Sequence, residues 1–143
     1  MNILLVEDNP ADTRLVREAL AEGEMSVELH WVSTGEAALE FLRRGAAFRA
    51  APTPDLVLLD LNLPGLSGQE VLKEVKSDPV LRSIPVVVLT SSAAPQDISA
   101  AYHAHVNSYA VKPADFERFL AMMATIRSYW LTVALPPKRI SQQ

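Results

Sequence analysis

The sequence predicts one α/β domain, in which helices cover both faces of a parallel β-sheet. Five short strand-like segments alternate in strict order with five segments of helical pattern along the 143 residues. Such alternation favours a parallel sheet, because each crossover helix brings the chain back to start the next strand in the same direction. Most of the strand-like segments are continuously apolar, as expected of strands buried on both faces.

The composition limits the size and class of the protein. Hydrophobic residues make up 49% of the chain and charged residues 21%, which fits an ordinary globular protein. The length suffices for one hydrophobic core but not for two. We therefore expect a single domain over residues 1–135 and a loose C-terminal tail over residues 136–143.

Charge and patterning exclude several functional classes. The formal net charge of -4 gives no basic footprint for nucleic acid. The chain has no cysteine, which excludes disulfides and thiolate metal sites. The N-terminus lacks the pattern of a signal peptide, and no apolar stretch approaches the roughly 18 residues needed to cross a bilayer. We expect a cytoplasmic protein that binds neither nucleic acid nor membranes.

The first strand–helix pair begins with the apolar run Ile3–Val6. Asn9 is a good N-cap and Pro10 is tolerated at the first helical position. The helix is expected to end at Gly23, since glycine favours the conformation that closes a helix.

The second pair begins with residues 27–32, where apolar and polar residues alternate as in a half-exposed strand. Ser33 is followed three residues later by Glu36, which predicts a capping box at the start of the next helix. That helix is expected to end near Gly45.

The third pair contains the segment on which the functional prediction depends. The run Leu56–Leu59 predicts a buried strand, and Asp60 stands at its exit. Ser67 and Glu70 match a second capping box, and the helix that they start is expected to stop at Asp78 before a proline.

The last two pairs follow the same pattern. Residues 84–90 predict the fourth strand, with a short helix from Pro95 to about Ala104. Residues 107–111 predict the fifth strand, and a final helix is expected over about 114–133. One side of that helix is predicted to be apolar and to face the core, and it carries Phe116, Phe119, Leu120, Met123, Ile126 and Trp130. If Trp130 and Leu131 are exposed, they are expected to form an apolar patch for a partner.

Four of the five strands end in a functional group: Glu7 with Asp8, then Asp60, Thr90 and Lys112. The carboxyl ends of parallel strands lie on one edge of a sheet, so these groups can meet in one cleft. Carboxylates that lie close together repel one another, and a hard cation such as Mg²⁺ resolves this with oxygen ligands. The lysine and the hydroxyl can bind phosphoryl oxygens, and one carboxylate can act as nucleophile.

Four motifs in this order resemble the response-regulator receiver domain of two-component signalling, and the resemblance covers essentially the whole chain: Val6-Glu7-Asp8-Asn9, Leu59-Asp60 with Pro64-Gly65, Leu89-Thr90-Ser91, and Val111-Lys112-Pro113. This resemblance implies a receiver domain over residues 1–135 with a flavodoxin-like (βα)5 fold and strand order 2-1-3-4-5. It also implies a phosphoacceptor switch that catalyses only its own phosphorylation and dephosphorylation.

The resemblance implies a role for each site residue. Asp60 accepts a phosphoryl group from a sensor histidine kinase. Asp8, Asp60 and the backbone carbonyl of Asn62 bind Mg²⁺, and Glu7 acts through a water molecule. Glu7 is a mild departure, because many receivers have aspartate at this position.

Three further residues receive roles from the same resemblance. Lys112 pairs with the phosphoryl group or, without it, with the acceptor carboxylate, and a cis peptide bond is expected between Lys112 and Pro113. Thr90 moves toward the phosphate, and Tyr109 changes rotamer with it. The sequence leaves open the alternative that Tyr109 is a core or edge aromatic residue with no switching role.

A narrower resemblance links the chain to the single-domain regulators that partner bacterial phytochromes. It rests on Asn9-Pro10-Ala11-Asp12, the segments 59–64, 76–79 and 84–90, and Tyr129-Trp130-Leu131. It implies a sensor histidine kinase as partner, with a phytochrome among the candidates. We expect a stand-alone regulator that signals to an unknown downstream protein, and a homodimer through the last strand and helix is a secondary hypothesis.

Two rival functions belong to other classes. A phosphatase of the haloacid-dehalogenase type also uses a strand-end aspartate, but it requires a second aspartate at the position of Asn62. A receiver-like binding module that has lost phosphorylation is disfavoured, because every group of the acceptor site is present. Simpler interpretations are that Glu7 and Asp8 only favour the dipole of the first helix, and that Thr90 is an ordinary strand residue.

Overall fold

The computed structural model describes residues 1–22, 26–135 and 137. Its centre is a five-stranded parallel sheet with the order β2-β1-β3-β4-β5, which confirms the predicted strand order. The strands are β1 (Asn2–Val6), β2 (Glu28–Val32), β3 (Leu56–Leu59), β4 (Val86–Thr90) and β5 (Ser108–Val111).

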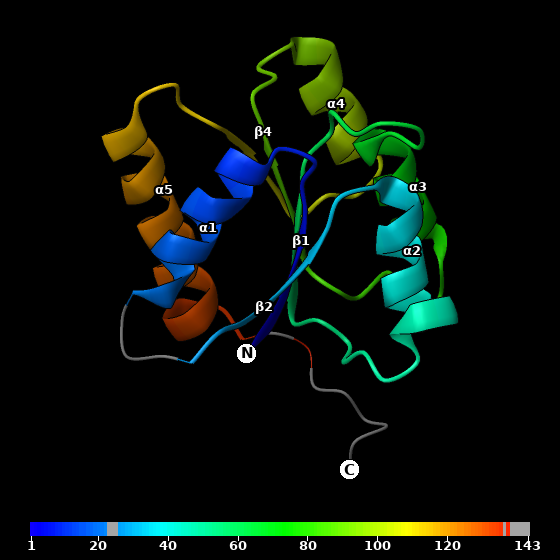
Figure 1. Ribbon diagram of the computed structural model, residues 1–143. Coiled ribbons are helices and arrows are strands. Elements are labelled where there is room, and N and C mark those ends of the chain that lie inside the picture. The colour runs from blue at the N-terminus through cyan, green and yellow to red at the C-terminus, as the bar shows by residue number, and fades with distance from the viewer. Residues whose placement is uncertain (23–25, 136, 138–143) are drawn as a thin grey trace.

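Helices cover both faces of this sheet, as predicted. They are α1 (Pro10–Ala21), α2 (Gly35–Arg43), α3 (Gly68–Ser77), α4 (Pro95–His103) and α5 (Phe116–Ser128), with a 3-10 turn at Ala46–Phe48 and a π turn at Tyr129–Val133. Helices α1 and α5 lie side by side on one face, and α2, α3 and α4 follow one another on the other face (Figure 1). Among the described residues, no helix is long and apolar enough to cross a membrane.

Each face of the sheet buries its own apolar cluster. Ile3 and Leu5 of β1 point to the face of α1 and α5, where they join Phe119 and Met123. Leu4 and Val6, one residue out of phase, join the cluster under α2, α3 and α4. Successive side chains of a strand point to opposite faces, so continuously apolar strands are required to fill both clusters.

The helix caps agree with the sequence at two positions and differ at a third. Asn9 accepts hydrogen bonds from the backbone N–H groups of the first turn of α1, and Ser67 accepts one from Glu70. The capping box predicted at Ser33 is wrong. Thr34 is the N-cap of α2 instead, and its hydroxyl accepts the N–H of Ala37 at 3.1 Å. Serine and threonine are both good N-caps, so the sequence pattern placed the start of the helix one residue too early.

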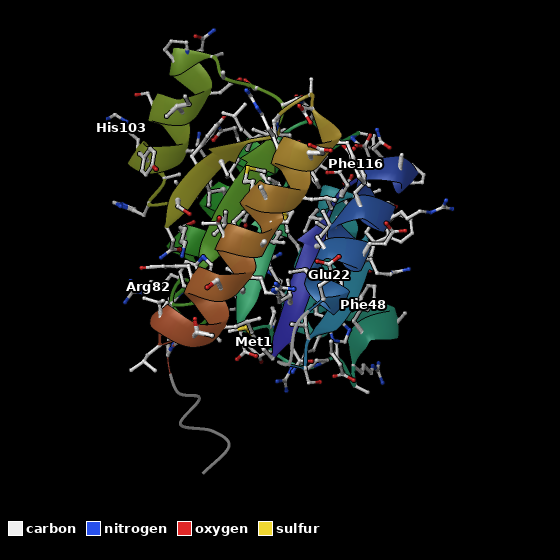
Figure 2. All side chains as sticks on the ribbon, turned by 90° about the vertical axis from the view of Figure 1, so that its left-hand side faces the viewer. Met1, Glu22, Phe48, Arg82, His103 and Phe116 are labelled. Carbon is white, nitrogen blue, oxygen red and sulfur yellow. The ribbon has the colours of Figure 1, made fainter. Side chains whose placement is uncertain are left out.

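The last helix corrects the expectation for Phe116 and agrees with the predicted apolar stripe at Trp130. Phe116 does not belong to the buried stripe of the last helix, because it is 53% exposed at the first position of α5, behind the N-cap Asp115. Figure 2 shows Phe116 at that end of α5. Trp130 is half-buried and packs against the cluster under α1 and α5. It therefore contributes to the core rather than to an exposed patch.

Three further expectations concern a cis peptide bond, the end of the first helix and the C-terminal tail. The described residues contain no cis peptide bond, so the expected cis bond before Pro113 is wrong. Helix α1 ends at Ala21, while the predicted stop at Gly23 lies outside the described residues. The predicted tail also lies outside them, except for Pro137.

Candidate functional site

The functional groups predicted from the strand ends meet at the carboxyl edge of the sheet. Glu7 and Asp8 follow β1, Asp60 follows β3, and Lys112 follows β5. Ladder hydrogen bonds continue one residue beyond the strands, since the Asp60 N–H donates to the Val6 carbonyl at 3.0 Å. These backbone bonds place the carboxyl groups beside one another.

Three carboxyl groups form a compact acidic cluster. Oxygen atoms of Glu7, Asp8 and Asp60 all lie within 4.8 Å of one another. Glu7 and Asp60 are buried at 2% and 5% exposure, whereas Asp8 is exposed. The cluster is therefore open to solvent on the side of Asp8 and closed beneath it.

Lys112, which directly follows the outermost strand β5, also reaches this cluster. Its ammonium group donates to Glu7 Oε2 at 2.7 Å, to Asp60 Oδ2 at 3.0 Å and to Asp12 Oδ2 at 3.0 Å. The pairing of Lys112 with Asp60 is the arrangement expected in the absence of a phosphoryl group. An ammonium group has three donors, and all three are used.

Sequence reasoning assigned no role to Asp12. It lies in the first turn of α1, which begins just after β1 and so opens at the same sheet edge. A signal was present, because a helix that follows a strand directly places its first-turn side chains near the strand end. Asp12 has the simpler interpretation of a first-turn acid that favours the helix dipole.

Burial and neighbouring charges shift the pKa values of the two buried carboxyl groups, Glu7 and Asp60, in opposite directions. Burial raises the pKa of Glu7 from 4.5 to about 7, against the opposing contact with Lys112. Burial also disfavours the ionised form of Asp60, but the N–H of Asn62 and a hydrogen bond with Glu7 outweigh it. The charge of Lys112 acts in the same direction, so the pKa of Asp60 is lowered. Of the two buried carboxyl groups, Asp60 is thus the one whose ionised form is favoured.

Lys112 keeps its proton for a related reason. Burial alone would lower its pKa, but the hydrogen bonds to Glu7 and Asp12 outweigh burial and raise the pKa. Lys112 is therefore protonated at neutral pH.

The segment after Asp60 fixes the direction of its side chain. The N–H of Asn62 donates to Asp60 Oδ1 at 3.0 Å, which leaves Oδ2 for Lys112. Gly65 has a φ of +69°, a left-handed conformation that glycine adopts without strain. Gly68 lies directly over the Asp60 backbone, since a Cβ there would come within 2.2 Å of the Asp60 carbonyl oxygen. The loop from β3 to α3 is therefore closely packed behind the Asp60 carboxylate.

Thr90 and Tyr109 lie on either side of the loop after β4. Thr90 is fully buried at the end of its strand. The hydroxyl of Tyr109 donates to the Ser92 carbonyl at 2.8 Å, and the hydroxyl of Ser92 donates to Asp97 at 2.5 Å. These bonds connect β5 to the first turn of α4 through a single loop residue.

The donor set suits a hard divalent cation. Carboxylate oxygens from Glu7, Asp8 and Asp60 converge, and the exposure of Asp8 leaves room for water ligands. Mg²⁺ prefers such a site, with one or two carboxylates and several waters. The residues present therefore fit the expected ion.

Comparison with known proteins decides the family. The sequence-family model of the response regulator receiver domain matches residues 3–124 of this chain. This chain belongs to that family. The receiver domain is 47% identical over 135 residues to response regulator Rcp1 of Synechocystis sp., a match that covers 94% of this chain and 92% of Rcp1.

Two solved structures are similar over almost their whole length. The Mn²⁺-bound form of response regulator Rcp1 has a TM-score of 0.93 at 44% identity, covering 96% of the receiver domain and 99% of that chain. The phosphorylated cyanobacterial phytochrome response regulator RcpA also has a TM-score of 0.93, at 45% identity, covering 96% and 98%. The predicted resemblance to regulators of phytochromes is confirmed.

Proposed function

We propose that this receiver domain accepts a phosphoryl group on Asp60 in a Mg²⁺-dependent reaction with a sensor histidine kinase. The observation that supports this most directly is the position of Asp60. Its Oδ2 lies 3.0 Å from the Lys112 ammonium and beside the oxygens of Glu7 and Asp8. A nucleophile, a cation and a set of metal ligands are thus brought together at one carboxylate.

In this proposal Asp8 and Asp60 bind Mg²⁺ directly, together with the backbone carbonyl of Asn62, while Glu7 acts through water. The ion supplies charge neutralisation for the incoming phosphoryl oxygens. The Mn²⁺ in the similar Rcp1 structure supports a divalent ion at this edge. The burial of Glu7 behind the more exposed Asp8 supports the division of roles.

The chain supplies the remaining groups for phosphoryl transfer. Asp60 is held ionised by its hydrogen bond from Asn62 and by the charge of Lys112. In the phosphorylated state, we expect Lys112 to donate a hydrogen bond to one phosphoryl oxygen and the Thr90 hydroxyl to donate to another. Positioning and charge stabilisation of this kind account for most catalysis of phosphoryl transfer.

The response is proposed to spread from Thr90 to Tyr109. A phosphoryl group adds about -1.5 to -2 charges and draws the Thr90 hydroxyl toward it. The loop residue Ser92, two positions on, then shifts, and the hydrogen bond from Tyr109 to its carbonyl has to change. The surface formed by α4, β5 and α5 would thereby differ between the two states.

The partners follow from the family and its relatives. A receiver domain takes its phosphoryl group from a phosphohistidine, and RcpA is a phytochrome response regulator. We therefore propose a phytochrome-type histidine kinase as the donor and a protein as the downstream target. A homodimer through β5 and α5, and a cytoplasmic location, stay predictions.

Incubation with acetyl phosphate and Mg²⁺, followed by intact-mass spectrometry, tests the proposal. We expect one phosphoryl group per chain, none after Asp60→Asn and none in the presence of a metal chelator. Phosphorylation of the Asp60→Asn variant to the wild-type level would refute the assignment of the acceptor. Transfer from a panel of autophosphorylated histidine kinases, with a phytochrome among them, then tests the partner.

A further inference from the structure

The third partner of Lys112 is not required by the phosphoacceptor function. Of the three carboxylates around its ammonium group, the side chains of Glu7 and Asp60 are 2% and 6% exposed, whereas that of Asp12 is 30% exposed. Asp12 comes from a helix rather than from a strand end. It therefore differs from the other two in both origin and access to solvent.

The ammonium group has no donor left for a phosphoryl oxygen. Its three N–H groups are used by Glu7, Asp60 and Asp12 at 2.7 to 3.0 Å. A phosphoryl group arriving on Asp60 needs at least one of these donors. The bond to Asp12 is the least costly to give up, because a partly exposed carboxylate can regain hydrogen bonds from water.

On the basis of the function proposed above, we propose that Asp12 is a positioning residue that holds Lys112 toward α1 before phosphoryl transfer and thereby slows that transfer. Two physical effects act in the same direction. Lys112 must first break its pair with Asp12. The Asp12 charge also repels an anionic phosphoryl donor that approaches the exposed side of the site.

The step itself is ordinary phosphoryl transfer. In the reaction with an acyl phosphate, the bond from phosphorus to the donor oxygen breaks, and a bond forms from phosphorus to a carboxylate oxygen of Asp60. The donor leaves as a carboxylate. Asp12 touches neither reacting atom and acts only through Lys112.

The test is the rate constant for phosphorylation by acetyl phosphate at saturating Mg²⁺. Asp12→Asn removes the charge while keeping the shape of the side chain. We expect it to raise the rate constant about fivefold, which corresponds to about 1 kcal/mol. Saturating Mg²⁺ separates this effect from any weakening of metal binding by the lost charge.

Glu18→Gln is the matched control. It removes one negative charge from the same helix at an exposed position and should leave the rate constant unchanged. Asp12→Glu keeps the charge, and its rate constant should lie between those of wild type and Asp12→Asn. Lost packing alone would slow the reaction or lower stability, so acceleration distinguishes positioning from a structural role.

A second readout does not depend on activity. In the metal-free protein, the ammonium protons of Lys112 should exchange faster with water after Asp12→Asn, as observed by NMR, but not after Glu18→Gln. If Asp12→Asn were poorly folded, Asp12→Ser would serve the same comparison. A rate constant equal to or below that of wild type in a folded variant would overturn this inference. Failure of wild type itself to take a phosphoryl group would instead overturn the proposed function.

Discussion

At the scale of single residues, Glu7 is a carboxyl group placed where its charge is costly without a metal ion. It is almost fully buried and lies beside Asp60, which is also negative. Burial raises its pKa from 4.5 to about 7. The folded protein therefore keeps a proton on Glu7 over a pH range in which the unfolded chain has lost it.

This difference predicts how stability depends on pH. Between pH 4.5 and 7, the folded state binds more protons at Glu7 than the unfolded state, so the free energy of unfolding falls as pH rises. The loss attributable to Glu7 is on the order of 3 kcal/mol. The lowered pKa of Asp60 has the opposite sign, but it acts below the ordinary pKa of 3.8.

Urea unfolding of the metal-free protein at pH 5 and pH 7.5 measures this effect. Glu7→Gln resembles the protonated form at every pH, so its stability should fall less than that of wild type over this interval. Parallel pH profiles for the two proteins would contradict the prediction. The chelator must be present throughout, since a bound cation would favour the ionised form of Glu7.

At the scale of secondary-structure elements, the start of α3 is fitted closely against the exit of β3. A Cβ on Gly68 would lie 2.2 Å from the Asp60 carbonyl oxygen and 2.5 Å from Leu61 Cα. Both of these atoms belong to the backbone and cannot rotate away. Helix α3 can therefore begin this close to Asp60 only with glycine at this position.

Gly68→Ala should accordingly destabilise the protein by about 3 kcal/mol, since overpacking against a backbone forces a local shift. It should also slow phosphorylation by acetyl phosphate, because the shift occurs at Asp60. Gly45→Ala is the control, because among the described residues its Cβ would meet only the Glu40 carbonyl oxygen, at an ordinary contact distance of 4.0 Å. Equal effects of the two substitutions on urea unfolding and phosphorylation would contradict this account.

The elements also show what the sequence can and cannot predict. The meeting of Asp8, Asp60 and Lys112 was predictable, because all three follow strands of one parallel sheet and must lie at one edge. The contact of Asp12 with Lys112 was not, because it depends on how α1 is rotated over the sheet. The exposure of Phe116 was missed for a similar reason. Helical spacing groups it with buried residues, but it stands at the first position of α5, where the helix does not yet cover the sheet.

At the scale of the whole molecule, the two faces of the sheet differ in how their packed residues connect to the site at the carboxyl edge. Trp130 packs against the cluster under α1 and α5, so the π turn Tyr129–Val133 that follows α5 is attached to the core. Tyr109 packs against the other cluster, and its hydroxyl bonds to Ser92. In the proposed response, a change at the carboxyl edge would therefore reach α4 through Ser92 and Tyr109, on the face of the sheet opposite to α1 and α5.

The acidic cluster of Glu7, Asp8 and Asp60 also connects metal binding to the stability of the entire domain. The carboxylates of Glu7, Asp8 and Asp60 come from two strands and meet only in the folded chain. A cation that binds this cluster stabilises the folded state by mass action, by about 2.7 kcal/mol at a concentration 100 times its dissociation constant. Thermal unfolding should therefore shift to higher temperature as Mg²⁺ is added, and return when it is chelated.

Asp8→Asn makes this prediction specific to the cluster. Without metal, the variant should be at least as stable as wild type, because it removes one of three carboxylates that repel each other. With Mg²⁺, it should gain much less stability, since the exposed ligand of the cluster is lost. Glu18→Gln, which removes a charge away from the cluster, should respond to Mg²⁺ as wild type does. If Asp8→Asn gained as much as wild type in a calorimetric titration of melting temperature against Mg²⁺, the ion would have to bind elsewhere, and the metal-assisted role of this edge would be wrong.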